Sequence, residues 1–195
     1  MATALIQERG TVSGNQNRMT RLNEDAAQTF LAGTPLQINN ATGALKAWDG
    51  VTISNGIAGI CKEFGANLTT AGVPLGTTQP ASNAPQVGGG ITFGSVQNEP
   101  AAQNLSRPYF NDGKTSVVLA IPDNVFYGQV GPAQTVVATD IGKQYGMTKD
   151  ADGHWFVDKT KTGVSACVVI VGFDNWDTTR GVLFTFLSAV GQITA

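Results

Sequence analysis

The feature that most limits the possible folds is a series of short runs of β-branched and aromatic residues, each ended by turn-forming residues. These runs lie at 114–121, 124–130, 135–142, 154–158, 165–173 and 181–187. Val, Ile, Phe, Trp and Thr suit the pleated, half-buried surface of a strand. Strands separated by turn signals every 8–12 residues or so indicate an all-β barrel or sandwich. The sequence therefore predicts an all-β fold, as a β-barrel or a jelly-roll-like sandwich.

The run at 165–173 is the most apolar of the series. Alternate residues from Cys167 to Phe173 would share one face of a strand, and Val168 and Ile170 would take the other face. Because both sets are apolar, we expect both faces of this strand to be covered, as in the centre of a barrel or sandwich.

The first half of the chain has fewer strand-like runs and longer irregular segments. Runs at 34–38 and 44–48 flank a five-residue stretch that ends in Gly43, which is typical of a β-hairpin, and a further run covers 57–64. Residues 65–90 are rich in Pro, Gly, Asn and Thr and show no periodicity. A loop of this length inside a domain is usually functional or lies across a partner.

Residues 1–32 are polar and have too few apolar side chains to form a core. We interpret them as an extended N-terminal arm that lies on another surface, with a disordered tail as the alternative. Asn23 followed by two acidic residues could begin a short helix that Gly33 ends. The predicted organisation is an arm at 1–32, an N-terminal β region at 33–107 that includes the 65–90 loop, and a C-terminal β-barrel region at 108–195.

Composition excludes several classes of function. The 12 basic and 14 acidic residues give a formal net charge of −2, and only 13% of residues are charged. Nucleic-acid binding needs clustered Lys and Arg, so we expect no nucleic-acid partner. No run of about 18 apolar residues occurs, so we expect no membrane span. The N-terminus lacks the pattern of a secretory signal, which favours synthesis in a cytoplasm.

The chain has two cysteines, Cys61 and Cys167, which lie far apart in the sequence. In a reducing cytosol such residues are usually small, buried, apolar side chains. A disulfide and a role in metal binding are the alternatives.

The stretch "KDADGHWFVD" at 149–158 places three carboxylates around the single histidine, His154. It fails the template of a calcium-binding EF-hand loop, because His154 stands where an acid is needed. A zinc site would need further His or Cys ligands, and no serine-hydrolase elbow is present. Asp152 followed by Gly153 is typical of a tight turn, so we interpret the stretch as a β-hairpin. Weak cation binding by Asp150, Asp152 and His154, or catalysis there, are the alternatives.

No other motif indicates catalysis, a cofactor or a metal, so the sequence predicts a binding or structural protein and not an enzyme. Two competing hypotheses remain. A carbohydrate- or receptor-binding module, such as a head fibre or a lectin-like sandwich, would present exposed aromatic rings, for which Tyr109, Tyr127 and Trp176 are candidates. A hydrolase would need an acidic pair, and Glu63 is the single mid-chain glutamate in a strand-like run.

Five stretches in the second half of the chain carry a further signal: "FYGQV" at 126–130, "DIGKQYGMT" at 140–148, "DGHWFVD" at 152–158, "VVIVG" at 168–172 and "VLFTFL" at 182–187. In these stretches the chain resembles the capsid decoration (cement) proteins of tailed bacteriophages. The stretches at 32–50 and 57–69 are similar to the N-terminal part of such proteins. The signatures contain no catalytic residue.

This resemblance implies a β-barrel or jelly-roll-like protein on the outer surface of an icosahedral phage head. Such proteins are usually homotrimers at local three-fold axes, where they hold neighbouring copies of the major capsid protein together. For this chain we therefore expect a structural virion protein that is made in the host cytoplasm. Arg9, Arg18 and Arg21 are the candidate residues for contact with the capsid or a neighbouring subunit.

Overall fold

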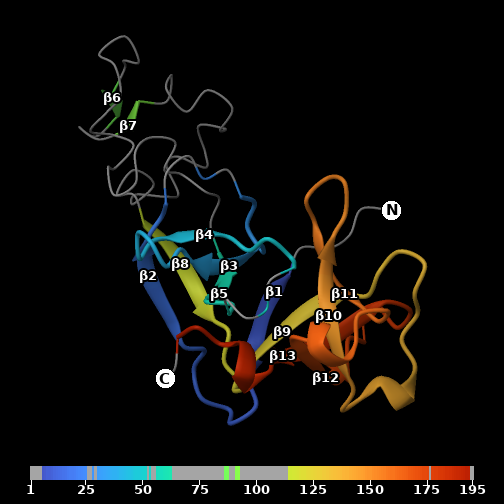
Figure 1. Cartoon of the computed structure of the whole chain (residues 1–195). Coiled ribbons are helices and arrows are strands. Elements are labelled where there is room, and N and C mark those ends of the chain that lie inside the picture. Colours follow the sequence, from blue (N-terminus) through green and yellow to red (C-terminus); the bar gives the residue numbers. More distant parts are fainter. Residues whose placement is uncertain are drawn as a thin grey trace.

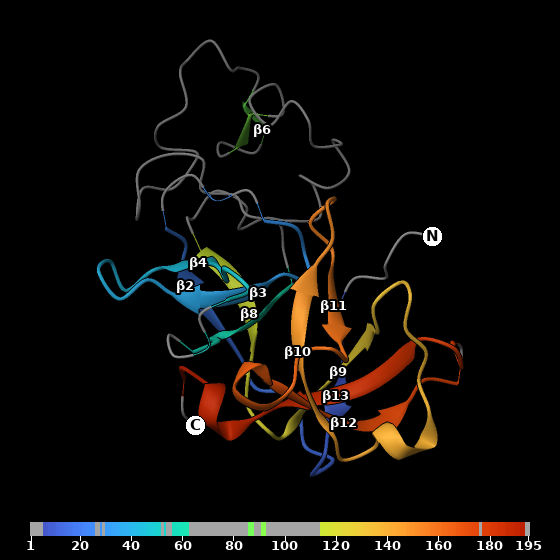
Figure 2. The same cartoon turned by 45° about the vertical axis from the view of Figure 1, so that its right-hand side comes forward.

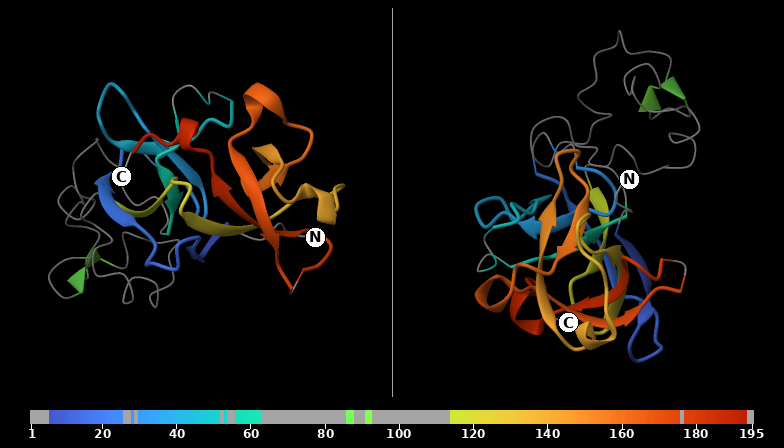
Figure 3. Two further views of the ribbon diagram at one scale, coloured as in Figure 1. Left: turned by 90° about the horizontal axis from the view of Figure 1, so that it is seen from below. Right: turned by 90° about the vertical axis from the view of Figure 1, so that its right-hand side faces the viewer.

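The computed structural model describes residues 6–25, 28, 30–51, 53, 56–62, 86–87, 91–92, 114–175 and 177–193. In these residues two antiparallel β-sheets pack together as an all-β sandwich, and the helical segments are single 3-10 turns (Figure 1). Seen from below, the two sheets lie side by side (Figure 3). The predicted all-β sandwich is confirmed. None of the described segments is a helix with the length and apolarity that crossing a bilayer requires.

The larger sheet has six strands in the order β1-β9-β13-β12-β10-β11. Its strands are β1 (Gln7–Thr11), β9 (Asn124–Gln129), β10 (Gln144–Lys149), β11 (Trp155–Asp158), β12 (Val168–Phe173) and β13 (Gly181–Phe186). The sheet curls until its last strand meets β9 again. Val157 of β11 forms a parallel bridge with Val130, and the Gly131 N–H donates to the Val157 carbonyl at 3.1 Å. This closure gives the C-terminal region a barrel-like shape around the rings of Phe126, Phe184 and Phe186.

The smaller sheet has five strands in the order β2-β8-β5-β3-β4. Its strands are β2 (Met19–Asn23), β3 (Pro35–Ile38), β4 (Leu45–Ala47), β5 (Gly59–Cys61) and β8 (Lys114–Leu119). This sheet also curls, because Glu24 bridges Leu45 and the Asp25 N–H donates to the Leu45 carbonyl at 2.7 Å. A second, smaller apolar cluster that includes Leu36, Leu45 and Val117 lies on its inner side.

Two strands of the smaller sheet contribute to both apolar clusters, because successive side chains of a strand point to opposite faces. Ile60 of β5 and Val118 of β8 belong to the larger cluster, which also contains the barrel phenylalanines. Their neighbours Cys61 and Val117 belong to the smaller cluster. β5 and β8 therefore form the wall that the two cores share.

A pair of tryptophans makes a second link between the sheets. Trp48 follows β4 in the smaller sheet, and Trp155 begins β11 in the larger one. Their rings stack with centroids 5.2 Å apart, and both side chains are almost fully buried. The β10–β11 hairpin that carries Trp155 projects from the barrel (Figure 2).

The predicted extended arm is wrong for the described part of residues 1–32. β1 pairs with β9 and β2 pairs with β8, so both segments are strands within the sheets. Edge strands of this kind are held by backbone hydrogen bonds and need little apolar patterning. Their polar sequences therefore lack the alternation from which strands are predicted. The short helix predicted after Asn23 is also wrong, because Asn23 ends β2 and Glu24 forms the bridge to β4.

The three predicted regions interleave in the fold. β8 follows the predicted boundary at 107/108, yet it pairs with β2 and β5 of the smaller sheet. The boundary itself and most of the 65–90 loop lie outside the described residues, apart from β6 (Gln86–Val87), which pairs with β7 (Ile91–Thr92). The Lys62 N–H donates to the Ser116 carbonyl at 3.0 Å, so the chain leaves the smaller sheet beside the point where it re-enters.

The strand predicted at 135–142 is wrong. Residues Ala138–Asp140 form a 3-10 turn, η3, and two similar turns follow at Gly163–Ser165 (η4) and Ser188–Val190 (η5). The apolar sequence of 135–142 suits a strand, but the side chain of Asp140 fixes the local backbone in another way, as described below.

Candidate functional site

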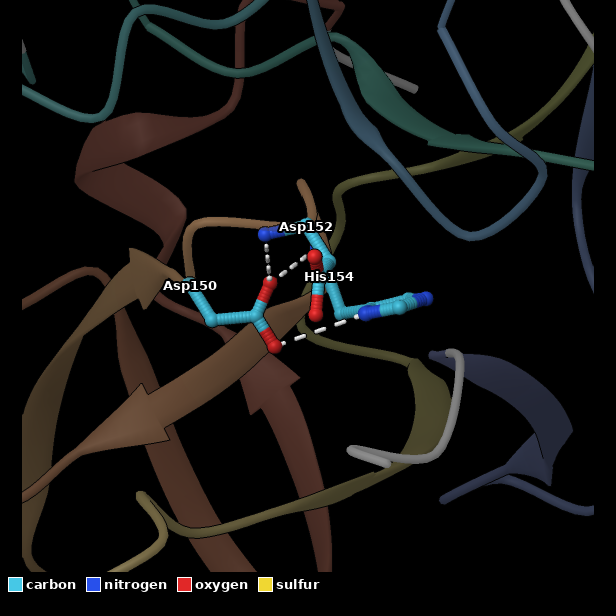
Figure 4. Close-up of side chains that lie close together, drawn as sticks. All are labelled: Asp150, Asp152 and His154. Atoms are coloured by element: carbon cyan, nitrogen blue, oxygen red, sulfur yellow. Dashed lines mark hydrogen bonds and ion pairs between the residues drawn. The ribbon is translucent and has the colours of Figure 1, made fainter. Parts of the chain in front are cut away.

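The stretch with three carboxylates and the single histidine is a β-hairpin turn, as predicted (Figure 4). The Asp150 N–H donates to the His154 carbonyl at 2.9 Å, which closes the loop between β10 and β11. Asp150 Oδ1 accepts the backbone N–H groups of Asp152 at 3.0 Å and of His154 at 2.8 Å. Gly153 has φ +87°, a conformation that glycine adopts without steric cost.

The same three side chains are the one group of potential metal ligands found among the described residues. Asp150, Asp152 and His154 each place a ligand atom within 4.8 Å of the others. The Asp150 carboxylate, however, already binds two turn amides and lies 3.4 Å from His154 Nδ1. Desolvation raises the pKa of the Asp150 carboxyl, but the hydrogen bond from the His154 amide and the nearby histidine outweigh it, so the net pKa lies below its usual range. The turn therefore accounts for the arrangement without an ion.

A second polar cluster, which the sequence did not reveal, is centred on Asp140. This side chain is buried, yet its Oδ1 accepts the Tyr145 hydroxyl at 2.7 Å. Its Oδ2 accepts Lys159 Nζ at 2.6 Å and the Val137 N–H at 3.0 Å. These bonds join the segment around η3 to β10 and to the residue after β11. Buried polar groups need hydrogen-bond partners, and these bonds supply them for Asp140. We therefore interpret the cluster as structural.

The electrostatics of this cluster follow from its geometry. Burial raises the pKa of the Asp140 carboxyl, but the hydrogen bonds from Lys159 and Tyr145 outweigh burial, and the net pKa is lowered. Burial and the bond to Asp140 raise the pKa of Tyr145 to about 12. At neutral pH the Asp140 carboxyl is therefore ionised and the Tyr145 phenol is neutral, so the tyrosine presents no phenolate.

The sequence predicts that Asp140 lies in a strand at 135–142 and assigns its side chain no role. The apolar residues of this stretch do not alternate, so no pattern around Asp140 indicates an inward-facing carboxylate. Lys159, 19 positions away, is a partner that sequence spacing does not indicate.

Both cysteines are free and buried, as expected, and the disulfide alternative is wrong. Burial raises the pKa of each thiol to about 12. A thiol with such a pKa stays protonated at neutral pH and is a poor nucleophile. Cys61 donates its thiol to the Leu31 carbonyl at 3.0 Å, which fits a packing role.

Two of the three candidate arginines have their guanidinium groups engaged within the fold. Arg9 lies 3.3 Å from Asp174 Oδ2 and sits 5.0 Å above the centre of the Tyr127 ring. Arg9 is the extra residue of a β-bulge in β1, a device that re-aims a side chain. Arg21 donates to Ser116 Oγ at 3.0 Å.

Arg18 is different. Its side chain is exposed, and no described residue pairs with its guanidinium group. Its backbone is held by Asn124, which accepts the Arg18 N–H at 3.1 Å and donates to the Arg18 carbonyl at 3.1 Å. The structure does not gather the three arginines into one site, and their contact with a capsid stays a prediction.

The structure limits the two competing hypotheses. Tyr127 is only 8% exposed and is covered by Arg9, so it cannot offer its ring to a sugar. Tyr109, Trp176 and Glu63 lie outside the described residues.

Comparisons of the chain with protein-family models, with curated proteins and with solved structures find no match.

Proposed function

We propose that this chain is a structural virion protein that binds the outer surface of a tailed-bacteriophage head and stabilises contacts between major capsid protein subunits. The observation that carries the proposal is where the decoration-protein signatures lie in the fold. All five stretches of the second half fall on the curled sheet of β9 to β13 and on the η3 and hairpin turns that connect its strands. Signatures that form one structural unit are more informative than the same number of scattered matches.

The closure of both sheets supports a role on a particle surface. The bridges Val130–Val157 and Glu24–Leu45 occupy strand edges that would otherwise present unpaired backbone groups. Open edges pair promiscuously with other chains, a hazard where many copies are concentrated on one shell. Sheets whose edges are partly covered in this way, in a chain with few charged residues, suit dense, ordered packing on a protein surface.

The proposed arrangement is a homotrimer at local three-fold axes of the head. Several modest contacts made together give a large effective affinity, so a trimer can hold neighbouring capsid subunits even where each contact is weak. The protein would be made in the host cytoplasm and added to the head there.

Electron cryomicroscopy of phage particles that contain this chain tests the proposal. We expect density for the two curled sheets outside the shell at three-fold positions. Density inside the head, at the tail, or nowhere on the particle would contradict it. Light scattering of the purified protein is a second measurement, and a monomer at every accessible concentration would contradict the homotrimer.

A further inference from the structure

A cavity of about 320 Å³ lies between the start of β2, the turn from β8 to β9, and the segment after η5. These three segments gather at the lower end of the molecule in Figure 1. The lining includes Arg18, Ala120, Ile121, Pro122, Ser188 and Ile193. The walls are therefore mainly apolar, with one cationic side chain among them.

The backbone of Arg18 is fixed beside this cavity by a fully buried asparagine. Asn124 binds both the N–H and the carbonyl of Arg18, and it also donates to the Leu119 carbonyl at 2.9 Å. A buried polar side chain with all of these partners rigidifies the chain around it. The start of the Arg18 side chain is thus held in place before any ligand arrives.

The charge of Arg18 has no direct partner among the described residues. Asp123, the acidic residue of the lining, accepts hydrogen bonds from the N–H of Ser13 at 2.9 Å and from its hydroxyl at 2.8 Å. These bonds from the β1–β2 loop fix the position of the Asp123 carboxylate, and its negative charge remains in the lining. A guanidinium group that is free to make two parallel hydrogen bonds is suited to a carboxylate.

Two exposed apolar residues adjoin residues of the lining. Met19, the neighbour of Arg18, is 49% exposed, and Val12 is 67% exposed. The Val12 N–H donates to the Asp123 carbonyl at 2.8 Å, which places Val12 beside the lining. Large apolar residues gathered around a hollow on a surface indicate a site of protein contact.

The cavity of about 350 Å³ near Phe126 lacks this combination. Lys62 in its lining forms an ion pair with Glu8, so the charge of Lys62 is matched.

We propose that the Arg18 cavity binds a segment of a partner protein in which an apolar side chain lies next to a carboxylate. The apolar side chain would enter the hollow beside Ile121 and Ile193, and the carboxylate would pair with the Arg18 guanidinium. The identification of this partner as the major capsid protein rests on the proposed function, whereas the chemistry of the ligand rests on the cavity alone.

The test uses N-acetyl-leucine as the probe and N-acetyl-leucinamide, which lacks the carboxylate, as its matched control. We expect saturable NMR shifts of the Arg18 side chain and the methyl groups of Ile121 and Ile193, with millimolar affinity for so small a ligand. The amide should bind at least about fivefold more weakly, because it cannot form the charged pair.

Two variants of the full chain separate the cavity from a general charge effect. Arg18→Gln should abolish the preference for the carboxylate, and Lys46→Gln, which removes a cation from β4, should retain it. Equal binding of the two probes, an unchanged preference in Arg18→Gln, or no saturable shift at these residues would each overturn the proposal.

Co-sedimentation with undecorated phage heads then distinguishes the two proposals. We expect Arg18→Gln to bind heads more weakly than wild type and Lys46→Gln to bind like wild type. If wild type binds heads and Arg18→Gln binds equally well, the capsid segment does not occupy this cavity and the inference is wrong. If wild type fails to bind heads while N-acetyl-leucine binds as expected, the proposed function fails and the ligand chemistry of the cavity is supported.

Discussion

Asp140 is the residue whose environment differs most from what its sequence neighbours indicate. It lies in an apolar segment, yet its buried carboxylate accepts bonds from Tyr145, Lys159 and the Val137 amide. These bonds connect the segment around η3 with β10 and the end of β11, and bonds of Gln134 with Asp158 and Lys159 add to the same connection. The hydrogen bonds of the Asp140 side chain therefore determine the local backbone conformation.

We predict that Asp140→Asn destabilises the protein by about 2–4 kcal/mol, because it leaves the Lys159 ammonium group without its carboxylate partner. Chemical denaturation at neutral pH would measure the change. Asp152→Asn removes an exposed carboxylate of the hairpin turn and is the matched control, with an expected change within about 0.5 kcal/mol. A loss no larger than that of the control would show that the Asp140 cluster contributes little.

Wild type and Asp140→Asn should also differ in how their stability depends on pH. The folded protein lowers the pKa of Asp140 below the ordinary value of 3.8. Its contribution to stability is therefore complete above that value and is lost as the pH falls through the folded pKa. Wild type should lose stability on acidification more steeply than Asp140→Asn. Some slope remains in the variant, because the pKa values of Asp158 and Asp177 are also lowered. Parallel acid-unfolding curves would contradict this account.

At the scale of single elements, β5 depends on a glycine. A Cβ atom on Gly59 would lie 2.2 Å from the Val118 carbonyl oxygen and 2.4 Å from a Val117 methyl group. Because the nearer atom belongs to the backbone of the paired strand, β5 and β8 could not keep their present separation. The shared wall of the two cores is thus possible only with glycine at this position.

We predict that Gly59→Ala destabilises the fold by more than about 2 kcal/mol, through this steric clash. Thermal and urea unfolding would measure it. Gly172→Ala in β12 is the control, since its Cβ would meet Leu183 at 3.5 Å, an ordinary contact. Similar stabilities of the two variants would mean that β5 and β8 can separate at little cost.

The sequence predicts well those elements whose conformation is determined by residues within the element itself. The β10–β11 hairpin follows from Asp152 and Gly153, which lie within the turn itself. The sequence predicts that both faces of β12 are covered, and this is wrong. Val168 and Ile170 are buried, but Val169 is half-buried and Val171 is 40% exposed, so the second face reaches solvent. Apolar residues on both faces of a strand do not by themselves show that a partner covers each face.

The surroundings of the three candidate arginines are harder to predict, because the residues that their side chains contact are distant in the chain. Arg9 meets Asp174 across 165 positions, and Arg21 meets Ser116 across 95. A single sequence contains no signal for such pairs. The sequence therefore names all three arginines as candidates for contact with the capsid or a neighbouring subunit. In the fold, Arg9 and Arg21 use their guanidinium groups internally, and Arg18 is exposed.

At the scale of the whole molecule, the two curled sheets are not independent units. β5 and β8 supply side chains to both apolar clusters, and β8 belongs by sequence to the half of the chain that forms the other sheet. Trp48 and Trp155 add a stacked contact between the sheets. Loss of one core would expose a wall of the other.

We therefore predict a single cooperative unfolding transition. Tryptophan fluorescence, which includes the stacked pair between the sheets, and far-ultraviolet circular dichroism should give coincident denaturation curves. Two separate midpoints, or a stable fragment that begins at residue 108, would show that the C-terminal barrel region folds without the smaller sheet.

The hydrogen bond between Lys62 and Ser116 has a consequence for how the protein could be altered. Because Lys62 and Ser116 are hydrogen-bonded, the chain departs from the smaller sheet and rejoins it at neighbouring points. The pairing at those points is made by Gly59–Cys61 and Val117–Leu119. A change of sequence between residues 63 and 113 would therefore leave both partners of that pairing in the chain.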